Sequence, residues 1–232
     1  PALTRSMGAL QSKTYDLAIV GGGVVGAGVA SYACASGLSV ALLEESDYAS
    51  GLSGKSPKLV HGGLRHLAGA DIKRLREAAR EREILHRMAP HLAEEATMLI
   101  PLRNQFSWIK YKLARRFYNL FGQVEQRARD EASGIKHVRN AEPILSSNKF
   151  RKVGSYREVL ADEARIVIAA LRDATKNGAE CANYVRVDSI EQRRDQYFLH
   201  STDQLSGKEV TVRCRCVVNA AGSWAEQLLG ED

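Results

Sequence analysis

The sequence predicts an α/β fold in which a parallel sheet is extended by an antiparallel meander and interrupted by a second region. Three observations predict this fold. In residues 15–44 a short apolar run is followed by a glycine-rich turn, a small-residue helix and a second apolar run. Two amphipathic helices are expected, at 71–88 and 161–177. Four short strand-like runs follow, at 182–187, 189–193, 196–201 and 209–219.

The turn in the first segment contains the pattern G-x-G-x-x-G as Gly21, Gly23 and Gly26. Gly21 lets the chain turn sharply off the strand, Gly23 lets the backbone approach a pyrophosphate, and Gly26 lets the helix pack closely against the sheet. The helix N-terminus offers unpaired N–H groups and the positive end of its dipole to phosphates. Glu44 ends the second apolar run and can accept hydrogen bonds from ribose hydroxyls. The segment therefore predicts a Rossmann-like dinucleotide-binding domain.

The absence of charged residues between Asp16 and Glu44 is also compatible with a membrane span or a signal peptide. Clustered glycines interrupt the hydrophobicity, however, and Gly37 stands where a helix is expected to end. The helical stretch after the turn is rich in Ala and Gly rather than in Leu. A βαβ unit explains all of these features, whereas a span explains only the missing charges.

The composition is that of a soluble globular protein. The 232 residues are 44% hydrophobic and carry a net charge of +6, and this length allows one large or two small domains. The four cysteines are too few and too scattered for a secreted disulfide framework, which favours the reducing cytoplasm. Cys214 and Cys216 share one face of an expected strand, and no His or further Cys lies nearby in the sequence. A structural role is therefore predicted for them rather than a metal site.

The remaining segments predict the domain organisation. Residues 1–13 lack periodicity and are expected to form a disordered lead-in. Residues 45–70 form a long polar loop, which inside a compact fold is usually functional. A strand is expected at 96–102, and the stretch 123–150 is polar and irregular. The expected domains are a first part of the nucleotide-binding domain at 14–95, a partial cap or substrate region at 96–158 and a second part of the nucleotide-binding domain at 159–232.

Residues 105–121, QFSWIKYKLARRFYNLF, interleave aromatic and basic side chains. Such a segment can lie at a membrane surface, with its rings at headgroup depth and its cations near anionic lipids. The alternative is an ordinary cap helix with a buried aromatic face and a solvated basic face. Nucleic-acid binding is not predicted, because no recognised nucleic-acid-binding module accompanies the segment.

The long loop contains a more specific pattern, S-x-x-K-L-V-H-G-G-L-R, from Ser56 to Arg65. It follows D-L-A-I-V-G-G-G-x-x-G-A-G and E-x-x-D-Y-A-S-G. Further segments are E-R-E-I-L-x-x-M-A-P-H-L at 81–92, D-E-A-R-I-V at 162–167 and V-N-A-A-G-x-W at 218–224. Together they resemble the FAD-dependent glycerol-3-phosphate dehydrogenases of the glycine/D-amino-acid oxidase superfamily. The resemblance covers essentially the whole chain and favours FAD over NAD.

The resemblance implies a bound FAD and the oxidation of sn-glycerol 3-phosphate to dihydroxyacetone phosphate, with hydride passing from C2 of the substrate to N5 of the flavin. It implies a quinone as electron acceptor, or oxygen as in the oxidase relatives, and leaves open whether the chain forms a homodimer. The expected location is the cytoplasm, and a position at the inner face of the cytoplasmic membrane is expected if residues 105–121 contact lipid rather than form an ordinary cap helix.

The resemblance also implies individual roles for site residues. His61 and Arg65 are expected near the flavin and the substrate. Arg offers a bidentate fork to a phosphate dianion, and His is a base that titrates near neutrality and can take the C2 hydroxyl proton. Val187 is expected to contact the adenine through its backbone. The implied FAD contacts are Gly21, Gly23, Gly26, Glu44, Ser50, Gly51, Ser53, Ser56, Lys58, Leu59, His61, Gly62, Gly63, Val187, Ala221 and Gly222.

The sequence departs from the family pattern at three loop positions. Leu52 stands where Thr is usual, Pro57 where Ser or Thr is usual, and His66 where Tyr is usual. Pro57 removes a backbone donor from a loop expected to donate to the cofactor. Because of these three departures, the first alternative to a glycerol-3-phosphate dehydrogenase is another FAD-dependent oxidoreductase of the superfamily that acts on an amine or a hydroxy acid. Family members also continue well past this chain's end, so an N-terminal portion is expected, and a non-catalytic dinucleotide-binding module is the second alternative.

Overall fold

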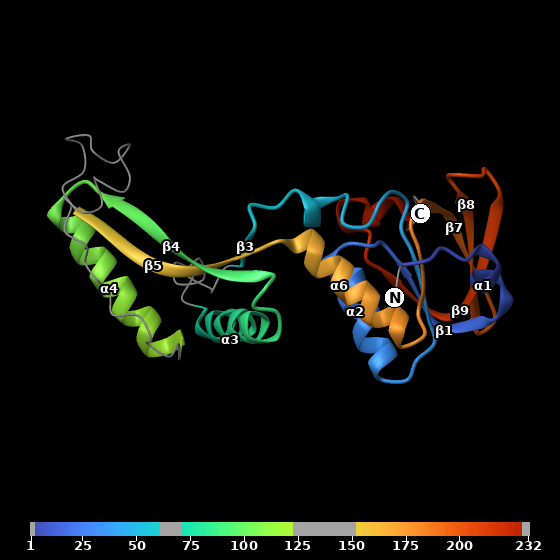
Figure 1. The fold of residues 1–232 in the computed structure, drawn as a ribbon, viewed down its shortest axis with the longest axis horizontal. Coiled ribbons are helices and arrows are strands. Elements are labelled where there is room, and N and C mark those ends of the chain that lie inside the picture. The colour runs from blue at the N-terminus through green and yellow to red at the C-terminus, as the bar shows by residue number, and fades with distance from the viewer. Residues whose placement is uncertain (1–2, 61–70, 123–151, 229–232) are drawn as a thin grey trace. The chain divides into compact units, whose positions relative to one another are not determined.

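The computed structural model of the chain describes residues 3–60, 71–122 and 152–228. The chain forms two compact units (Figure 1). Unit 1 comprises Pro1–Pro57 and Asp162–Asp232, and unit 2 comprises Lys58–Ala161. The domain boundaries predicted from the sequence lie after residues 95 and 158, whereas the units of the structure change after residues 57 and 161. The first boundary therefore differs more from its prediction than the second. It falls earlier because the helix at 72–88 packs against the strand and helix that follow it.

Unit 1 is built on a six-stranded sheet with the order β6-β2-β1-β9-β8-β7. The pairings β6–β2, β2–β1 and β1–β9 are parallel, whereas the pairings β9–β8 and β8–β7 are antiparallel. The predicted parallel sheet with an antiparallel meander is therefore confirmed. The strands are β1 (Thr14–Val20), β2 (Val40–Leu43), β6 (Glu180–Ala182), β7 (Val185–Arg193), β8 (Gln196–Asp203) and β9 (Glu209–Asn219).

The run predicted at 182–187 is two strands rather than one. Glu180–Ala182 pairs with β2, whereas Val185 begins β7. Tyr184 lies between them with a φ of 54°, in the left-handed region that an L-residue seldom adopts. This turn takes the chain from the parallel part of the sheet to the meander.

Helices α2 (Val24–Ala35) and α6 (Glu163–Lys176) pack together on one face of the sheet (Figure 1). Their contact is close because α2 presents small side chains, Ala27, Ala30 and Ala33, to the core. Asp162 caps α6 by accepting a hydrogen bond from the backbone N–H of Arg165. A second apolar cluster, formed by the other face of β1 and β2 and by the meander, completes the core.

The prediction of a disordered N-terminal lead-in at residues 1–13 is wrong for Met7–Ser12. Met7–Ser12 form helix α1, capped by the Ser6 hydroxyl, and the Leu10 side chain is only 1% exposed. The Tyr15 hydroxyl donates a 2.8 Å hydrogen bond to the Ala9 carbonyl. So short a helix is unstable in isolation, and the burial of Leu10 in the second core cluster stabilises it.

In its described residues, unit 2 contains a three-stranded antiparallel sheet with the order β3-β5-β4 and two helices. The helix predicted at 71–88 and the strand predicted at 96–102 are both present, whereas β5 was not predicted. Strand β5 lacks clear alternation because it buries Glu158, whose carboxylate lies 3.6 Å from the Arg82 guanidinium of α3. The elements are β3 (Leu59–Val60), α3 (Ile72–Met88), β4 (Ala93–Leu102), α4 (Gln105–Gly122) and β5 (Lys152–Ala161).

Helix α4 rests on the sheet of unit 2 through Tyr111. A Cβ at Gly154 of β5 would lie 2.7 Å from the Tyr111 ring, so only glycine leaves room for it. The Tyr111 hydroxyl donates a 2.5 Å hydrogen bond to the Ser155 carbonyl, and Trp108 stacks on the Tyr111 ring with centroids 5.6 Å apart. Within the described ranges, no helix of this chain has the length and apolar character needed to cross a bilayer.

Candidate functional site

A cavity of about 690 Å³ opens in unit 1 at the carboxyl ends of β1, β2 and β9. Its wall comes from the glycine turn after β1, the acidic end of β2, the loop at 49–53, strand β7 and the junction after β9. Ligands of open α/β sheets bind at this edge, and small-molecule sites usually measure about 300–1,000 Å³. The cavity is therefore large enough and correctly placed for a dinucleotide.

The glycine turn brings three parts of unit 1 into close contact. Gly21 has a φ of 114°, and a Cβ there would lie 2.4 Å from the Ala220 carbonyl oxygen. A Cβ at Gly26 would lie 1.9 Å from the Gly21 carbonyl oxygen, so glycine lets α2 begin directly against the turn. A Cβ at Gly23 would meet only the Ser53 hydroxyl, at 3.1 Å. The N-terminus of α2 thus faces the cavity, with the Ser53 hydroxyl close to it.

Glu44 links the turn to the segment after β2. Its carboxylate accepts hydrogen bonds from the Gly22 N–H at 2.6 Å and from the Ser46 N–H at 2.9 Å. A Cβ at Gly22 would lie 2.8 Å from the Tyr48 ring, so glycine is favoured at this position as well. Burial raises the Tyr48 pKa, which keeps the phenol neutral at physiological pH. Gly22 was not among the predicted site residues, because it occupies a variable position of the pattern; the run of three consecutive glycines was the available signal.

The loop that follows β2 lies over the start of α2. The Val24 N–H donates a 3.0 Å hydrogen bond to the Ser53 hydroxyl, in the short helical turn η1 (Leu52–Gly54). This bond satisfies one of the free N–H groups at the helix N-terminus. Leu52 lines the cavity but is 77% exposed. The Ser53 hydroxyl therefore stands where a phosphate oxygen could approach the same N–H groups.

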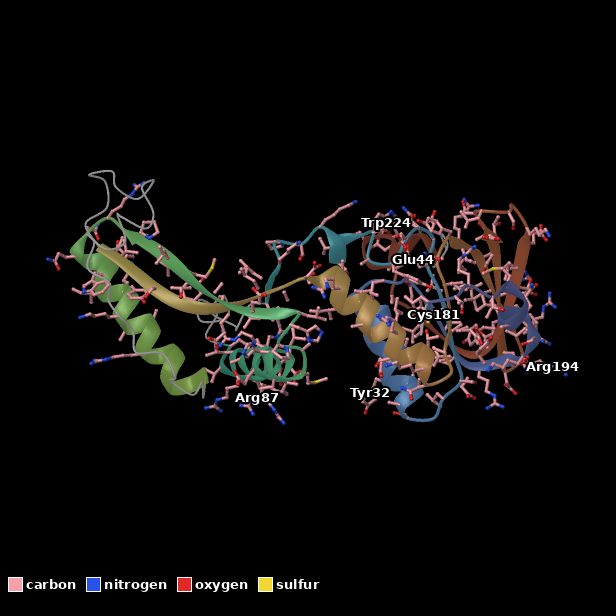
Figure 2. The ribbon with its side chains drawn as sticks, in the orientation of Figure 1. Tyr32, Glu44, Arg87, Cys181, Arg194 and Trp224 are labelled. Atoms are coloured by element: carbon pink, nitrogen blue, oxygen red, sulfur yellow. The ribbon has the colours of Figure 1, made fainter. Side chains whose placement is uncertain are left out.

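The junction after β9 forms another part of the cavity wall. The Ala220 N–H donates to the Val20 carbonyl at 2.8 Å, which continues the β1–β9 pairing to the cavity edge. Gly222 then has a φ of 58°, and η4 (Gly222–Leu228) begins. The Trp224 ring lies 3.4 Å from the position of a Cβ at Gly51 and lines the cavity, as does Glu44; both are labelled in Figure 2. Trp224 belongs to a motif that the sequence analysis used, yet its place in the wall was not predicted.

Strand β7 adds charged side chains that the sequence analysis missed. Arg186 donates a 2.7 Å hydrogen bond to the Asp188 carboxylate, which also accepts one from the Thr202 hydroxyl at 2.6 Å. Burial opposes ionisation of Asp188, but the bonds from Thr202 and Arg186 outweigh it and lower the Asp188 pKa. Arg186 and Asp188 flank Val187 on β7, where the register with β8 shifts between Val187 and Ser189, and no sequence motif distinguishes them.

The predicted site residues fall into three groups. Gly26 lies beneath the turn and contacts Gly21, whereas Ser56, Lys58 and Leu59 are not part of the wall, and the last two belong to unit 2. His61, Gly62, Gly63 and Arg65 lie outside the described residues. The predicted residues that line the cavity are Gly21, Gly23, Glu44, Ser50, Gly51, Ser53, Val187, Ala221 and Gly222.

Comparisons with known proteins assign the chain to a family. Residues 16–232 match the family model described as DAO, FAD dependent oxidoreductase. The chain is 35% identical over 226 residues to the aerobic glycerol-3-phosphate dehydrogenase of Bacillus subtilis, and 32% identical over 226 residues to the alpha-glycerophosphate oxidase of Streptococcus pyogenes. The matches cover 96% and 94% of this chain but 41% and 37% of those relatives. The chain thus spans about two fifths of the length of the curated relatives it matches.

A solved structure gives the same result. The glycerol-3-phosphate dehydrogenase from Bacillus halodurans complexed with FAD superposes with a TM-score of 0.72 at 28% identity, covering 95% of this chain and 37% of that one. A glycine oxidase from Bacillus cereus superposes with a TM-score of 0.71 at 22% identity, over 93% of this chain and 57% of that one, and supports the fold alone.

Proposed function

Because the chain belongs to the family of FAD-dependent oxidoreductases, we propose that it binds FAD in the cavity of unit 1. We further propose that the protein, with FAD bound, catalyses the oxidation of sn-glycerol 3-phosphate to dihydroxyacetone phosphate. The substrate follows from the glycerol-3-phosphate dehydrogenases and alpha-glycerophosphate oxidases to which the chain is similar. The chain spans only part of those relatives, so the whole reaction is proposed from similarity together with the cavity.

The observation that carries the proposal is the convergence of the glycine turn, the acidic end of β2 and the β9–η4 junction on one cavity. The turn and the α2 N-terminus offer N–H donors and a positive dipole end to a pyrophosphate. Glu44 stands beside them at the end of β2, where its carboxylate can accept from ribose hydroxyls. The two kinds of recognition are adjacent, as the ADP half of FAD requires.

The chain's own residues would bind and orient the reactants. When bound, FAD supplies the acceptor for the hydride that leaves C2 of the substrate. We propose that Arg65 binds the phosphate of the substrate through its guanidinium fork. We propose that His61 takes the proton of the C2 hydroxyl, since imidazole titrates near neutrality. Leu52, at the exposed rim of the cavity, would help to exclude water from the loop side.

The purified chain is expected to bind FAD and, with it, to reduce a dye acceptor when sn-glycerol 3-phosphate is added. The first measurement is flavin absorbance retained after desalting, and the second is dye reduction with sn-glycerol 3-phosphate and, in parallel, with glycine. A chain that cannot be reconstituted with FAD contradicts the proposal as a whole. Turnover of glycine but not of sn-glycerol 3-phosphate retains the cofactor and contradicts the substrate.

We also propose that electrons leave the flavin for a membrane quinone and that helix α4 contacts the lipid surface. The support is an exposed apolar stripe on α4 made of Phe106, Ile109 and Leu113, which are 64%, 60% and 60% exposed. Lys110 lies over the Phe106 ring and Lys112 over the Trp108 ring, so cations flank the stripe. This pattern is typical of a helix that lies in an anionic membrane interface.

Replacing Phe106, Ile109 and Leu113 together by serine is expected to reduce binding to phosphatidylglycerol-containing vesicles by about tenfold, because each exposed side chain loses apolar area that lipid would bury. Vesicle co-sedimentation measures the bound fraction. The control variant replaces Tyr32, Leu38 and Leu205 of unit 1 by serine, three other exposed large side chains. Equal losses in the two variants, or none in the first, would contradict the α4 contact.

A further inference from the structure

The N-terminal segment of the chain is bonded to the two stretches that support the acidic end of the cavity. Arg5 Nε donates a 2.8 Å hydrogen bond to the Asn183 carbonyl. The other side of the same guanidinium, Nη2, forms an ion pair with the Asp203 carboxylate at the end of β8. One side chain therefore joins residues that are 178 and 198 positions away along the chain.

Asn183 passes this restraint on to the cavity wall. Its amide donates a 2.8 Å hydrogen bond to the Asp47 carboxylate. The next two residues bond to the same wall segment: the Tyr184 N–H donates to the Ser46 carbonyl at 3.0 Å, and the Val185 N–H donates to the Glu44 carbonyl at 2.8 Å. Arg5 is thus connected, through the 183–185 stretch, to the backbone that carries the Glu44 carboxylate.

The Asp203 end of the restraint is equally fixed. The Asp203 side chain is 7% exposed, and its second oxygen accepts a 2.6 Å hydrogen bond from the Ser206 hydroxyl. The bonds from Ser206 and Arg5 lower the Asp203 pKa, so the carboxylate stays charged. The adjacent Gln204 N–H donates to the Tyr184 carbonyl at 2.8 Å. The two residues that Arg5 bonds therefore both connect to Tyr184, which has a left-handed backbone: Asn183 precedes it in the chain, and Gln204, next to Asp203, donates to its carbonyl.

We propose that Arg5 is a positioning residue for the nucleotide end of the cavity, a role that rests on the proposed binding of FAD. Its two fixed N–H groups hold residues 183–185 against residues 44–47, and this holds the Glu44 carboxylate toward the glycine turn. Arg5 itself is not part of the cavity wall. Its effect on the ligand is transmitted by the backbone that it orders.

The test compares Arg5→Ala with Arg5→Lys and with Arg215→Ala in the 232-residue chain. Arg215 pairs with Asp16 at 2.9 Å across a sequence separation of 199, so its removal also deletes a long-range Arg–Asp pair, but away from the cavity. FAD and ADP binding are measured by titration at equal native fraction, established by circular dichroism. Arg5→Ala is expected to weaken both by about tenfold, Arg5→Lys less, and Arg215→Ala not measurably.

Amide hydrogen exchange in the ligand-free chain gives the second readout. Arg5→Ala is expected to speed exchange at Tyr184 and Val185, whose N–H groups bond to residues 46 and 44, while the β1 amides keep their protection. Unchanged exchange at these two amides overturns the positioning role, whether or not the chain binds flavin. A wild-type chain that binds neither FAD nor ADP contradicts the proposed function instead. A uniform rise in exchange throughout unit 1 also overturns the proposal, because it assigns Arg5 a global structural role.

Discussion

Replacing Gly26 by alanine is expected to lower the free energy of unfolding of the chain by about 3 kcal/mol or more. The added Cβ would lie 1.9 Å from the Gly21 carbonyl oxygen, which is backbone and cannot rotate away. Relief would require α2 to move off the turn, and α2 packs through its small side chains on the sheet and on α6. Chemical denaturation followed by circular dichroism measures the change.

The matched control is Gly28→Ala, two residues further along the same helix. A Cβ at Gly28 would meet no atom within 4 Å, and this position is exposed. Alanine is favoured over glycine inside a helix, so this variant is expected to gain about 0.5–1 kcal/mol. Opposite signs for the two substitutions identify the close approach, rather than helix propensity, as the reason for glycine at 26. Equal effects would contradict that reason.

Replacing Glu44 by alanine is expected to weaken FAD binding by about thirtyfold, since hydrogen bonds to a charged group contribute about 1.5–3 kcal/mol. The carboxylate has two roles here. It can accept from the ribose hydroxyls, and it already accepts from the Gly22 and Ser46 N–H groups, which shape the turn. Quenching of Trp224 fluorescence by added FAD measures the dissociation constant, because this ring lines the same cavity.

Two further variants separate charge from position. Glu45→Ala removes a neighbouring carboxylate that also lines the cavity but is not bonded to the glycine turn by any contact described above. It is expected to change the dissociation constant less than threefold, within the range of a surface charge change. Glu44→Gln keeps an acceptor oxygen and loses the charge, and should fall between the two. A Glu45→Ala loss as large as that of Glu44→Ala would mean that only the net charge of the cavity matters.

Much of unit 1 could be predicted because its signals are local. The glycine spacing, the apolar runs on either side and the acid at position 44 lie within one continuous segment, and their spacing is typical of a dinucleotide-binding unit. The amphipathic helices at 72–88 and 163–176 were visible for the same reason, since the period of their apolar residues is a property of the segment alone.

Three features could not be predicted because their energy comes from distant partners. Helix α1 has no strong propensity and is stabilised by burying Leu10 against strands more than a hundred residues away. Strand β5 buries Glu158 beside Arg82, which removes the alternation that would have identified it. The charged wall formed by Arg186 and Asp188 looks like any exposed strand edge until β7 is placed beside the end of β2.

The sequence by itself determined the family, the glycine turn and the acid that faces it, because residue types and their spacing along the chain carry these motifs. Only the tertiary structure decided which glycines are sterically required, where Trp224 lies, and that Arg5 is bonded to the residues behind the acidic end of the same cavity. These depend on the register of β1 between β2 and β9 and on the turn at Tyr184. The register of these strands brings together residues up to about two hundred positions apart, and no local sequence pattern predicts those contacts.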